Sequence, residues 1–337
     1  MCKVFVPSGN FHIERQLPKS SENKIGDCEF VFNPEENYDY FVTLDGLTEP
    51  VECKVYKDHR LLFLGEPPYI KQYNQRFVKQ YGYVFSCQKK MIQKGQTEKS
   101  LPLLPWMVGM GFQENSHKTK GDTPYMTYDD FRSFNDDSAR LNRCCLITSN
   151  KKFTKGHRDR VHFTDYVIKH HSDIIDIYGN GYKSIPDKFD ILRKYKYAIV
   201  IENCKYPDYW TEKIGDCFLA SCYPIYHGCP NIEEFFPEGS FTEVNVRNIT
   251  ETIDKVRNIL DSELFEESTE KLVESKNLVL DEYNIFPQIA KCIFEIEKEN
   301  SNKDKSVMGD HELLYPMRLS FLDKVKQLIA WKLNLII

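Results

Sequence analysis

The chain has 337 residues, of which 41% are hydrophobic, and this length favours two domains, each with its own core. The 45 basic and 50 acidic residues give a net charge of −5, which argues against nucleic acid as a partner, and the 13% aromatic content argues against disorder. Eleven cysteines without a Cys-x-x-Cys spacing predict reduced thiols rather than a disulfide framework or a zinc site. Because residues 1–18 resemble neither a signal peptide nor a spanning helix, we expect a soluble cytoplasmic protein.

The first hundred residues alternate between strand and helix patterns. Residues 38–45 and 60–65 are short β-branched and aromatic stretches that end in turn residues, and residues 83–86 have the same character. Residues 70–79 are compatible with a helix, which gives an α/β alternation. From residue 88 to 142 this regularity fades, so we expect substrate loops or a linker there.

A tighter alternation follows. It predicts strands at 144–150, 174–181, 197–203 and 223–227, with helices reaching residue 171, covering 188–194 and opening near Thr211. Strands separated by helices form a parallel sheet, so each half of the chain is expected to be a doubly wound α/β domain. Two such domains facing across a cleft would bind ligands at the carboxyl ends of their strands.

Residues 314–337 differ from the rest of the chain. After a polar stretch from residue 299, apolar residues recur at helical spacing with lysines between them, which predicts an amphipathic helix. Two interpretations stay open: the helix packs on its own protein or a partner, or it is a basic anchor in peripheral contact with the cytoplasmic face of a membrane.

The stretch 197–241 is the densest in candidate functional residues. A strand delivers Glu202 and Asn203 to a loop, and Thr211 then caps a helix whose first turn holds Glu212 and Lys213. Free amides of that helix and the lysine would bind a diphosphate, and Glu212 would accept hydrogen bonds from ribose hydroxyls. The alternative is a plain helix cap with a solvated ion pair.

These residues resemble the donor-binding signature of the α-1,3/1,4-fucosyltransferases, glycosyltransferase family ten. The matching blocks are Glu202-Asn203, the Tyr209 to Lys213 run, and Gly228-Cys229-Pro230-Asn231. The resemblance implies a GT-B fold of two Rossmann-like domains, with acceptor binding in residues 1–145, donor binding in 146–300, and a linker and helix in 301–337. It also implies that Glu202, Asn203 and Tyr209 belong to the GDP-fucose site.

A second block extends this resemblance. The strand that ends in Ser149-Asn150, followed by Arg160 on the next helix, is similar to the family's phosphate-facing arrangement. Arg158 is the alternative; we assign Arg160, because an apolar residue three positions later fits the family's helix and its planar guanidinium can bind two phosphate oxygens. Taken alone, such a basic run is an ordinary solvated loop.

The candidate general base is Glu66, in the turn Gly65-Glu66-Pro67-Pro68 at a strand end, where the family also places its base. This carboxylate would take the proton of the acceptor hydroxyl while its oxygen attacks the anomeric carbon opposite the leaving GDP, which inverts the configuration. The alternative is that Glu66 only ends a strand.

We expect no required metal or other cofactor, with at most stimulation by a divalent cation, because no Asp-x-Asp occurs in the chain. The resemblance implies a hexosyltransferase that moves L-fucose from GDP-fucose to an oligosaccharide containing N-acetylglucosamine or glucose, in protein glycosylation or in surface-glycan or lipopolysaccharide synthesis. Two rivals remain: a transferase for another sugar nucleotide, and a non-catalytic scaffold that binds nucleotide or glycan. The acceptor, the linkage and the oligomeric state are not predicted.

Overall fold

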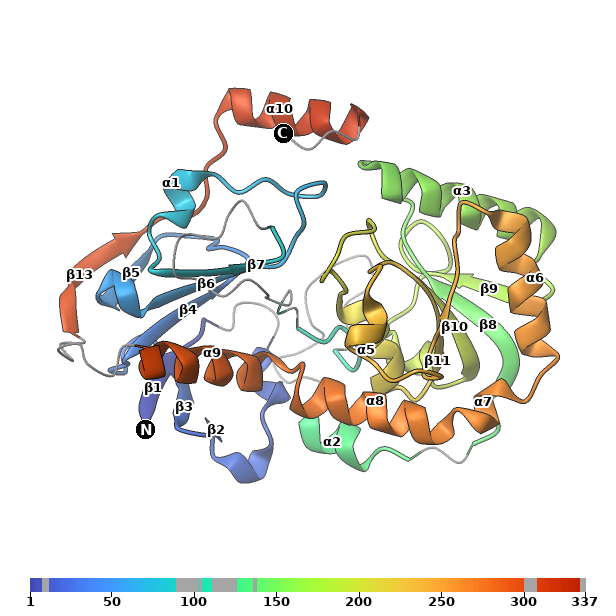
Figure 1. The fold of residues 1–337 in the computed structure, drawn as a ribbon, viewed down its shortest axis with the longest axis horizontal. Helices are drawn as coiled ribbons and strands as arrows, with labels where there is room; N and C mark the ends of the chain where they lie inside the picture. The colour runs from blue at the N-terminus through green and yellow to red at the C-terminus, as the bar shows by residue number, and fades with distance from the viewer. Residues whose placement is uncertain are drawn as a thin grey trace. The chain divides into compact units, whose positions relative to one another are not determined.

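A computed structural model describes residues 1–7, 12–88, 103, 105–110, 126–135, 138–299 and 308–333 (Figure 1). They form two compact units. Unit 1 comprises Met1–Pro105, Asp281–Ala330 and Leu335–Ile337, and unit 2 comprises Trp106–Leu280 and Trp331–Asn334. Relative to the ranges expected from the sequence, residues 106–145 lie in unit 2, and residues 281–300 lie in unit 1.

Unit 1 is built on a six-stranded sheet in the order β2-β3-β1-β4-β6-β7. All neighbouring pairs in it are parallel except β2 with β3. The strands are β1 (Cys2–Phe5), β2 (Lys24–Ile25), β3 (Cys28–Val31), β4 (Tyr40–Leu44), β6 (Arg60–Leu64) and β7 (Tyr83–Ser86).

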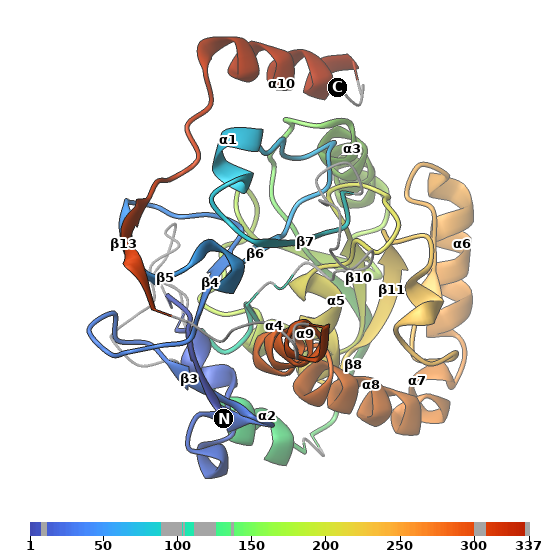
Figure 2. The same ribbon diagram turned by 60° about the vertical axis from the view of Figure 1, so that its left-hand side comes forward.

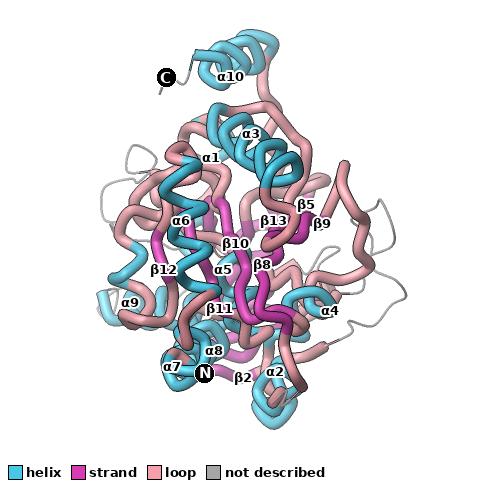
Figure 3. The backbone as a smooth tube through the Cα atoms, turned by 90° about the vertical axis from the view of Figure 1, so that its right-hand side faces the viewer, coloured by secondary structure: helices cyan, strands magenta, loops and turns pink. Residues whose placement is uncertain are grey.

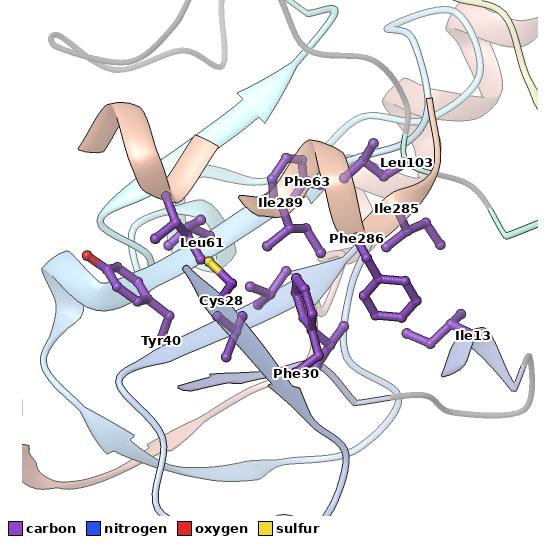
Figure 4. Packing of buried hydrophobic residues seen from close by; sticks show 14 of the residues in the cluster. Ile13, Cys28, Phe30, Tyr40, Leu61, Phe63, Leu103, Ile285, Phe286 and Ile289 are labelled. Carbon is purple, nitrogen blue, oxygen red and sulfur yellow. The ribbon is translucent and has the colours of Figure 1, made fainter. Parts of the chain in front are cut away.

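Side chains of these strands alternate between two cores, one on each face of the sheet. On β6, Leu61 and Phe63 join the cluster that α9 (Ile285–Glu299) covers, and Figure 4 shows them near Phe286 and Ile289. Leu62 and Leu64 face the cluster that holds Phe77 of the short helix α1 (Gln75–Val78). A helix from late in the chain therefore completes the first core, as the orange-red α9 beside the blue strands shows (Figures 1 and 2).

The predicted elements near the two ends of unit 1 differ from those observed. The helix expected over residues 70–79 is only the four-residue α1. Residues 308–314 form strand β13 (Met308–Leu314), which pairs antiparallel with β5 (Val51–Val55), so the C-terminal helix α10 spans only Phe321–Leu333. On α10, Leu322, Leu328 and Ile329 are exposed. Peripheral membrane contact through residues 314–337 stays a prediction.

Unit 2 contains a five-stranded parallel sheet in the order β12-β11-β10-β8-β9. Its central strand β10 is a nearly continuous apolar run, as expected for a strand covered on both faces. Helices α3 and α6 lie on one face of the sheet and α5 on the other (Figures 1 and 3). The strands are β8 (Leu141–Ile147), β9 (Ile175–Tyr178), β10 (Tyr195–Ile201), β11 (Tyr223–His227) and β12 (Thr242–Glu243). The helices are α2 (Tyr128–Ser133), α3 (Lys155–His170), α4 (Phe189–Leu192), α5 (Glu212–Leu219), α6 (Ile249–Leu260), α7 (Leu264–Glu267) and α8 (Thr269–Asp281).

The predicted fold class, two α/β units with parallel sheets, is confirmed. The stretch 88–142 is less irregular than expected, because it contains α2 and the start of β8 and buries Trp106, Val108 and Met110. Pro102 and Pro124, which helped to suggest loops, lie outside the described residues. All eleven cysteines are free thiols.

Candidate active site

A cavity of about 390 Å³ lies at the carboxyl ends of three neighbouring strands of unit 2. Its walls come from the loops that follow β8, β9 and β10 and from the first turns of α3 and α5. The polar side chains that line it are those of Thr148, Ser149, Lys151, His157, Arg160, Asn180, Ser184, Asp187, Lys188, Asn203, Glu212 and Lys213. Its volume falls in the range of small-molecule sites, which is about 300–1,000 Å³.

The strand order explains why a cavity opens at this place. From β8 the chain moves to β9 on one side and then crosses to β10 on the other side of β8, so the direction of winding reverses between β8 and β10. The loops after these two strands diverge at such a reversal, and ligands of open α/β sheets bind in the resulting crevice. The position of the cavity therefore favours a nucleotide or a similar ligand.

Arg160 spans this crevice from α3. Its Nη1 donates to Oδ1 of Asn203 after β10 at 2.8 Å, and its Nη2 donates to Oγ of Ser149 after β8 at 3.1 Å. The structure thus brings together three residues that the sequence placed in one site. Asn150, another residue of the predicted donor site, is exposed at this edge of the sheet, and its backbone amide donates to the carbonyl of Asn180 at 3.1 Å.

The charge of Arg160 has no counter-ion among the described residues. The residue is only 5% exposed, its Nε is buried without a hydrogen-bond partner, and no carboxylate lies within ion-pairing distance in the described part of the chain. Burial lowers the pKa of Arg160, yet a guanidinium stays protonated in proteins. A buried cation of this kind is costly unless an anion enters the cavity, so the geometry favours an anionic ligand.

The Thr-Glu-Lys triplet is organised by a carboxylate beneath it. Oε1 of Glu202 accepts from the amide of Thr211 at 2.8 Å, and Oε2 accepts from Nζ of Lys213 at 3.1 Å. Thr211 caps α5 by accepting from the amide of Lys213. Glu202 does not line the cavity and is 1% exposed, so it supports the first turn of α5 from below rather than contacting a ligand.

Two glycines permit the close approaches that this site requires. A Cβ at Gly228 would lie 2.5 Å from Cγ of Glu202, and a Cβ at Gly156 would lie 2.0 Å from the carbonyl oxygen of Asn203. Any other residue at Gly228 would displace the carboxylate under α5. The glycine of the Gly-x-Pro-Asn block thus has a steric role in the site.

Sequence reasoning missed Lys188, which also lines the cavity. Its Nζ lies 2.7 Å from Oδ2 of Asp216 and 3.7 Å from Oε1 of Glu212. Glu212 and Asp216 are four residues apart on α5, and two carboxylates on one helix face near a core require a cation. The spacing of Glu212 and Asp216 in the sequence could therefore have indicated a nearby cation, but it does not identify Lys188 as that cation.

Tyr209, which the resemblance places in the donor site, has a fully buried side chain and is not among the residues that line the cavity. Its assignment to the GDP-fucose site stays a prediction. The polar groups that the cavity does present are those of Arg160, Asn203, Ser149, Glu212 and Lys213 from the predicted set.

His157 lies in the first turn of α3 and closes a capping box with Thr154, whose Oγ1 lies 2.6 Å from the His157 Nδ1. Burial, together with the charge of Arg160, lowers the pKa of His157 to about 4. The imidazole is therefore neutral at pH 7, and it adds no charge to the cavity.

We expect this buried histidine to make the protein sensitive to acid. Between pH 6.5 and 4, His157 is protonated in the unfolded chain but stays neutral in the folded protein. The free energy of unfolding therefore falls as the pH drops through this range, by on the order of 3 kcal/mol. In His157→Gln, which keeps the capping box, the loss between pH 7 and pH 4 should be smaller by that amount in urea unfolding. The exposed His162 on the same helix provides the control. If His162→Gln reduced the acid-induced loss of stability and His157→Gln did not, His157 would not be the group responsible.

Glu66, the candidate base, lies in unit 1 and is partly exposed. Its turn is held by a polar network: its amide donates to Oη of Tyr73 at 3.1 Å, and its carbonyl accepts from Nε2 of Gln88 at 2.7 Å. Asp45 accepts from the amide of Gly65 at 3.1 Å and also contacts Tyr73. The turn is therefore fixed on both sides, although a catalytic role for Glu66 stays a prediction.

Within the ranges that the structure describes, no three His, Cys, Asp or Glu side chains are arranged to hold a metal ion. Over the same ranges, every helix is too short or too polar to span a bilayer.

The fold is a parallel α/β domain whose cavity, lined by the buried Arg160, lies at the topological switch point of the sheet. Among known proteins, residues 137–264 are similar to one family and match its model, "Glycosyltransferase family 10 (fucosyltransferase) C-term". The matched segment is less than half of the chain, and it contains β8 to α6 and nearly all of the residues around the cavity.

Similar curated proteins cover the chain only in part. A putative fucosyltransferase-like protein of Arabidopsis thaliana is 35% identical over 85 residues, which is 24% of this chain and 17% of the relative. The alpha-(1,3)-fucosyltransferase FucT of Helicobacter pylori is 35% identical over 78 residues, or 23% of this chain and 16% of the relative. The chain thus aligns with about a sixth of the length of each relative. A crystal structure of an alpha1,3-fucosyltransferase with GDP-fucose is 19% identical, with a TM-score of 0.49, and the match covers 88% of this chain and 90% of that chain.

Proposed function

We propose that this protein is an inverting glycosyltransferase that transfers L-fucose from GDP-fucose to a hydroxyl of a glycan containing N-acetylglucosamine or glucose. The observation that carries the proposal is the uncompensated Arg160 at the topological switch point of unit 2. The match of residues 137–264 to the fucosyltransferase family model supports the choice of donor.

In this mechanism the diphosphate of the donor lies against Arg160 and the amino-terminal amides of α5. The guanidinium offers a planar pair of donors, and the amino terminus of the helix offers a partial positive charge. As the bond from the anomeric carbon to the phosphate oxygen breaks, negative charge develops on the departing GDP. Arg160 and Lys213 stabilise that charge, so the leaving group needs no protonation.

The acceptor hydroxyl attacks the anomeric carbon from the side opposite the leaving GDP, and Glu66 takes its proton. One carboxylate is enough for this reaction, because the donor already carries a good leaving group. Because Arg160 and Lys213 neutralise the negative charge on the departing GDP, this mechanism needs no metal ion for that purpose. The product has the opposite anomeric configuration to the donor.

Incubation with GDP-fucose and a panel of N-acetyllactosamine and lipopolysaccharide-type acceptors tests this function. We expect released GDP together with an acceptor whose mass increases by one fucose. Other sugar nucleotides are assayed in parallel, and faster release from one of them would overturn the choice of donor. A protein that binds GDP but turns over none of the donors would favour the scaffold.

A further inference from the structure

Lys188 and Asp216 form an ion pair at the wall of the donor cavity that the proposed mechanism does not use. Nζ of Lys188 lies 2.7 Å from Oδ2 of Asp216, and the other carboxylate oxygen of Asp216 accepts from the amide of Met107 at 3.0 Å. The side chain of Asp216 is 1% exposed, whereas that of Lys188 is 25% exposed and lines the cavity. The pair therefore joins a buried anchor to a group at the cavity surface.

The second neighbour of Lys188 is Glu212, whose Oε1 is 3.7 Å from Nζ of Lys188 and 3.7 Å from Nζ of Lys213. Glu212 thus sits between two cations on different elements, because Lys188 precedes α4 and Lys213 belongs to α5. Burial opposes ionisation of Glu212, but the two lysines outweigh it and lower its pKa, so an ionised carboxylate faces the cavity at neutral pH.

We expect Lys188 to keep its ion pair with Asp216 rather than exchange it for a contact with a phosphate of the ligand. Moving it would leave a buried carboxylate without its cation, which is among the more costly changes in a protein interior. Arg160, in contrast, can bind a phosphate without breaking an ion pair, because no described carboxylate pairs with it. An incoming diphosphate should therefore be bound by Arg160, while Lys188 stays between the two carboxylates.

We propose that Lys188 is a positioning residue for the donor nucleoside: anchored on Asp216, it holds the carboxylate of Glu212 in the orientation that accepts hydrogen bonds from the ribose. The inference rests on the proposed function, since it assumes a nucleoside diphosphate in the cavity. It assigns recognition of the nucleoside to the set Lys188, Glu212 and Asp216, and recognition of the phosphates to Arg160 and Lys213.

The test compares the binding of GDP, GMP and guanosine by titration calorimetry or by competition. Because Lys188→Met alone leaves Asp216 buried and uncompensated, the main variant combines Lys188→Met with Asp216→Asn, which keeps an acceptor for the Met107 amide. Loss of the positioning contact should weaken all three ligands by the same factor, about tenfold. A factor that grows with the number of phosphates would show that Lys188 binds phosphate and would overturn the proposal, as would unchanged affinities.

A double-mutant cycle adds a readout that general loss of structure does not mimic. When Glu212 is first replaced by Gln, the Lys188→Met/Asp216→Asn change should have little further effect on GDP affinity, because the contact that it supports is already weakened. Equal effects in both backgrounds would overturn the positioning role. If the parent protein binds none of the three ligands, the proposed function fails and this inference fails with it; if the parent binds GDP but the cycle shows no coupling, only this inference fails.

Discussion

Replacement of Glu66 by Gln should reduce fucose transfer by at least about a hundredfold and leave GDP affinity unchanged. A carboxamide has nearly the same shape as the carboxylate but cannot take the proton of the acceptor hydroxyl. The backbone of the turn is held by Tyr73 and Gln88 through main-chain atoms of Glu66, and these contacts do not depend on its side chain. The substitution should therefore leave the fold of unit 1 intact.

The assay measures initial rates at saturating donor and acceptor, with GDP binding measured on the same preparations. The exposed Glu49 of unit 1 provides a matched control, and Glu49→Gln should retain the rate of the parent. A variant within a few-fold of the parent rate would remove Glu66 as the base.

Replacement of Glu202 by Gln should cost about 3 kcal/mol of stability, because it breaks a buried ion pair and leaves Lys213 without its main counter-ion. The carboxylate accepts two hydrogen bonds from the Thr211 hydroxyl and amide through Oε1, and one from Lys213 through Oε2. A neutral amide can replace only part of this set, and its NH₂ group would face Nζ of Lys213. The first turn of α5, which borders the cavity, should therefore loosen.

Urea unfolding followed by tryptophan fluorescence measures this loss, since the buried Trp106 and Trp210 both lie in unit 2. Glu266, which pairs with Lys196 at the surface, serves as the control. Glu266→Gln should change stability far less, because exposed ion pairs contribute little. Equal losses in the two variants would contradict the structural role given to Glu202.

The residues that sequence reasoning placed well are those whose position follows from local rules. Thr211 as a helix cap fixes Glu212 and Lys213 in the first turn of α5, and a strand that ends near Asn203 delivers it to the sheet edge. Arg160 was selected over Arg158 from the family resemblance, because an apolar residue three positions later fits the family's helix. Membership in a motif does not give side-chain direction, however: Glu202 and Tyr209 turn out to be buried beneath or beside the cavity.

What the sequence could not show depends on contacts between distant segments. Lys188 and Met107 meet at Asp216 only because the folded chain brings three separate stretches together. In unit 1, residues 308–314 carried no predicted element, and they form β13 by pairing with the distant strand β5. The return of α9 to the core of unit 1 likewise has no local signal, since its apolar face would fit either unit.

Titration of the full chain with GDP is the most direct test of the site in unit 2. The site predicts one GDP bound per chain, with guanosine bound more weakly. Arg160→Met should lose at least about tenfold in GDP affinity, because the buried guanidinium has no carboxylate partner among the described residues. The neighbouring Arg158, which does not line the cavity, should tolerate the same substitution. Absence of GDP binding, or equal binding by the parent and Arg160→Met, would contradict the diphosphate site on which the proposed function depends.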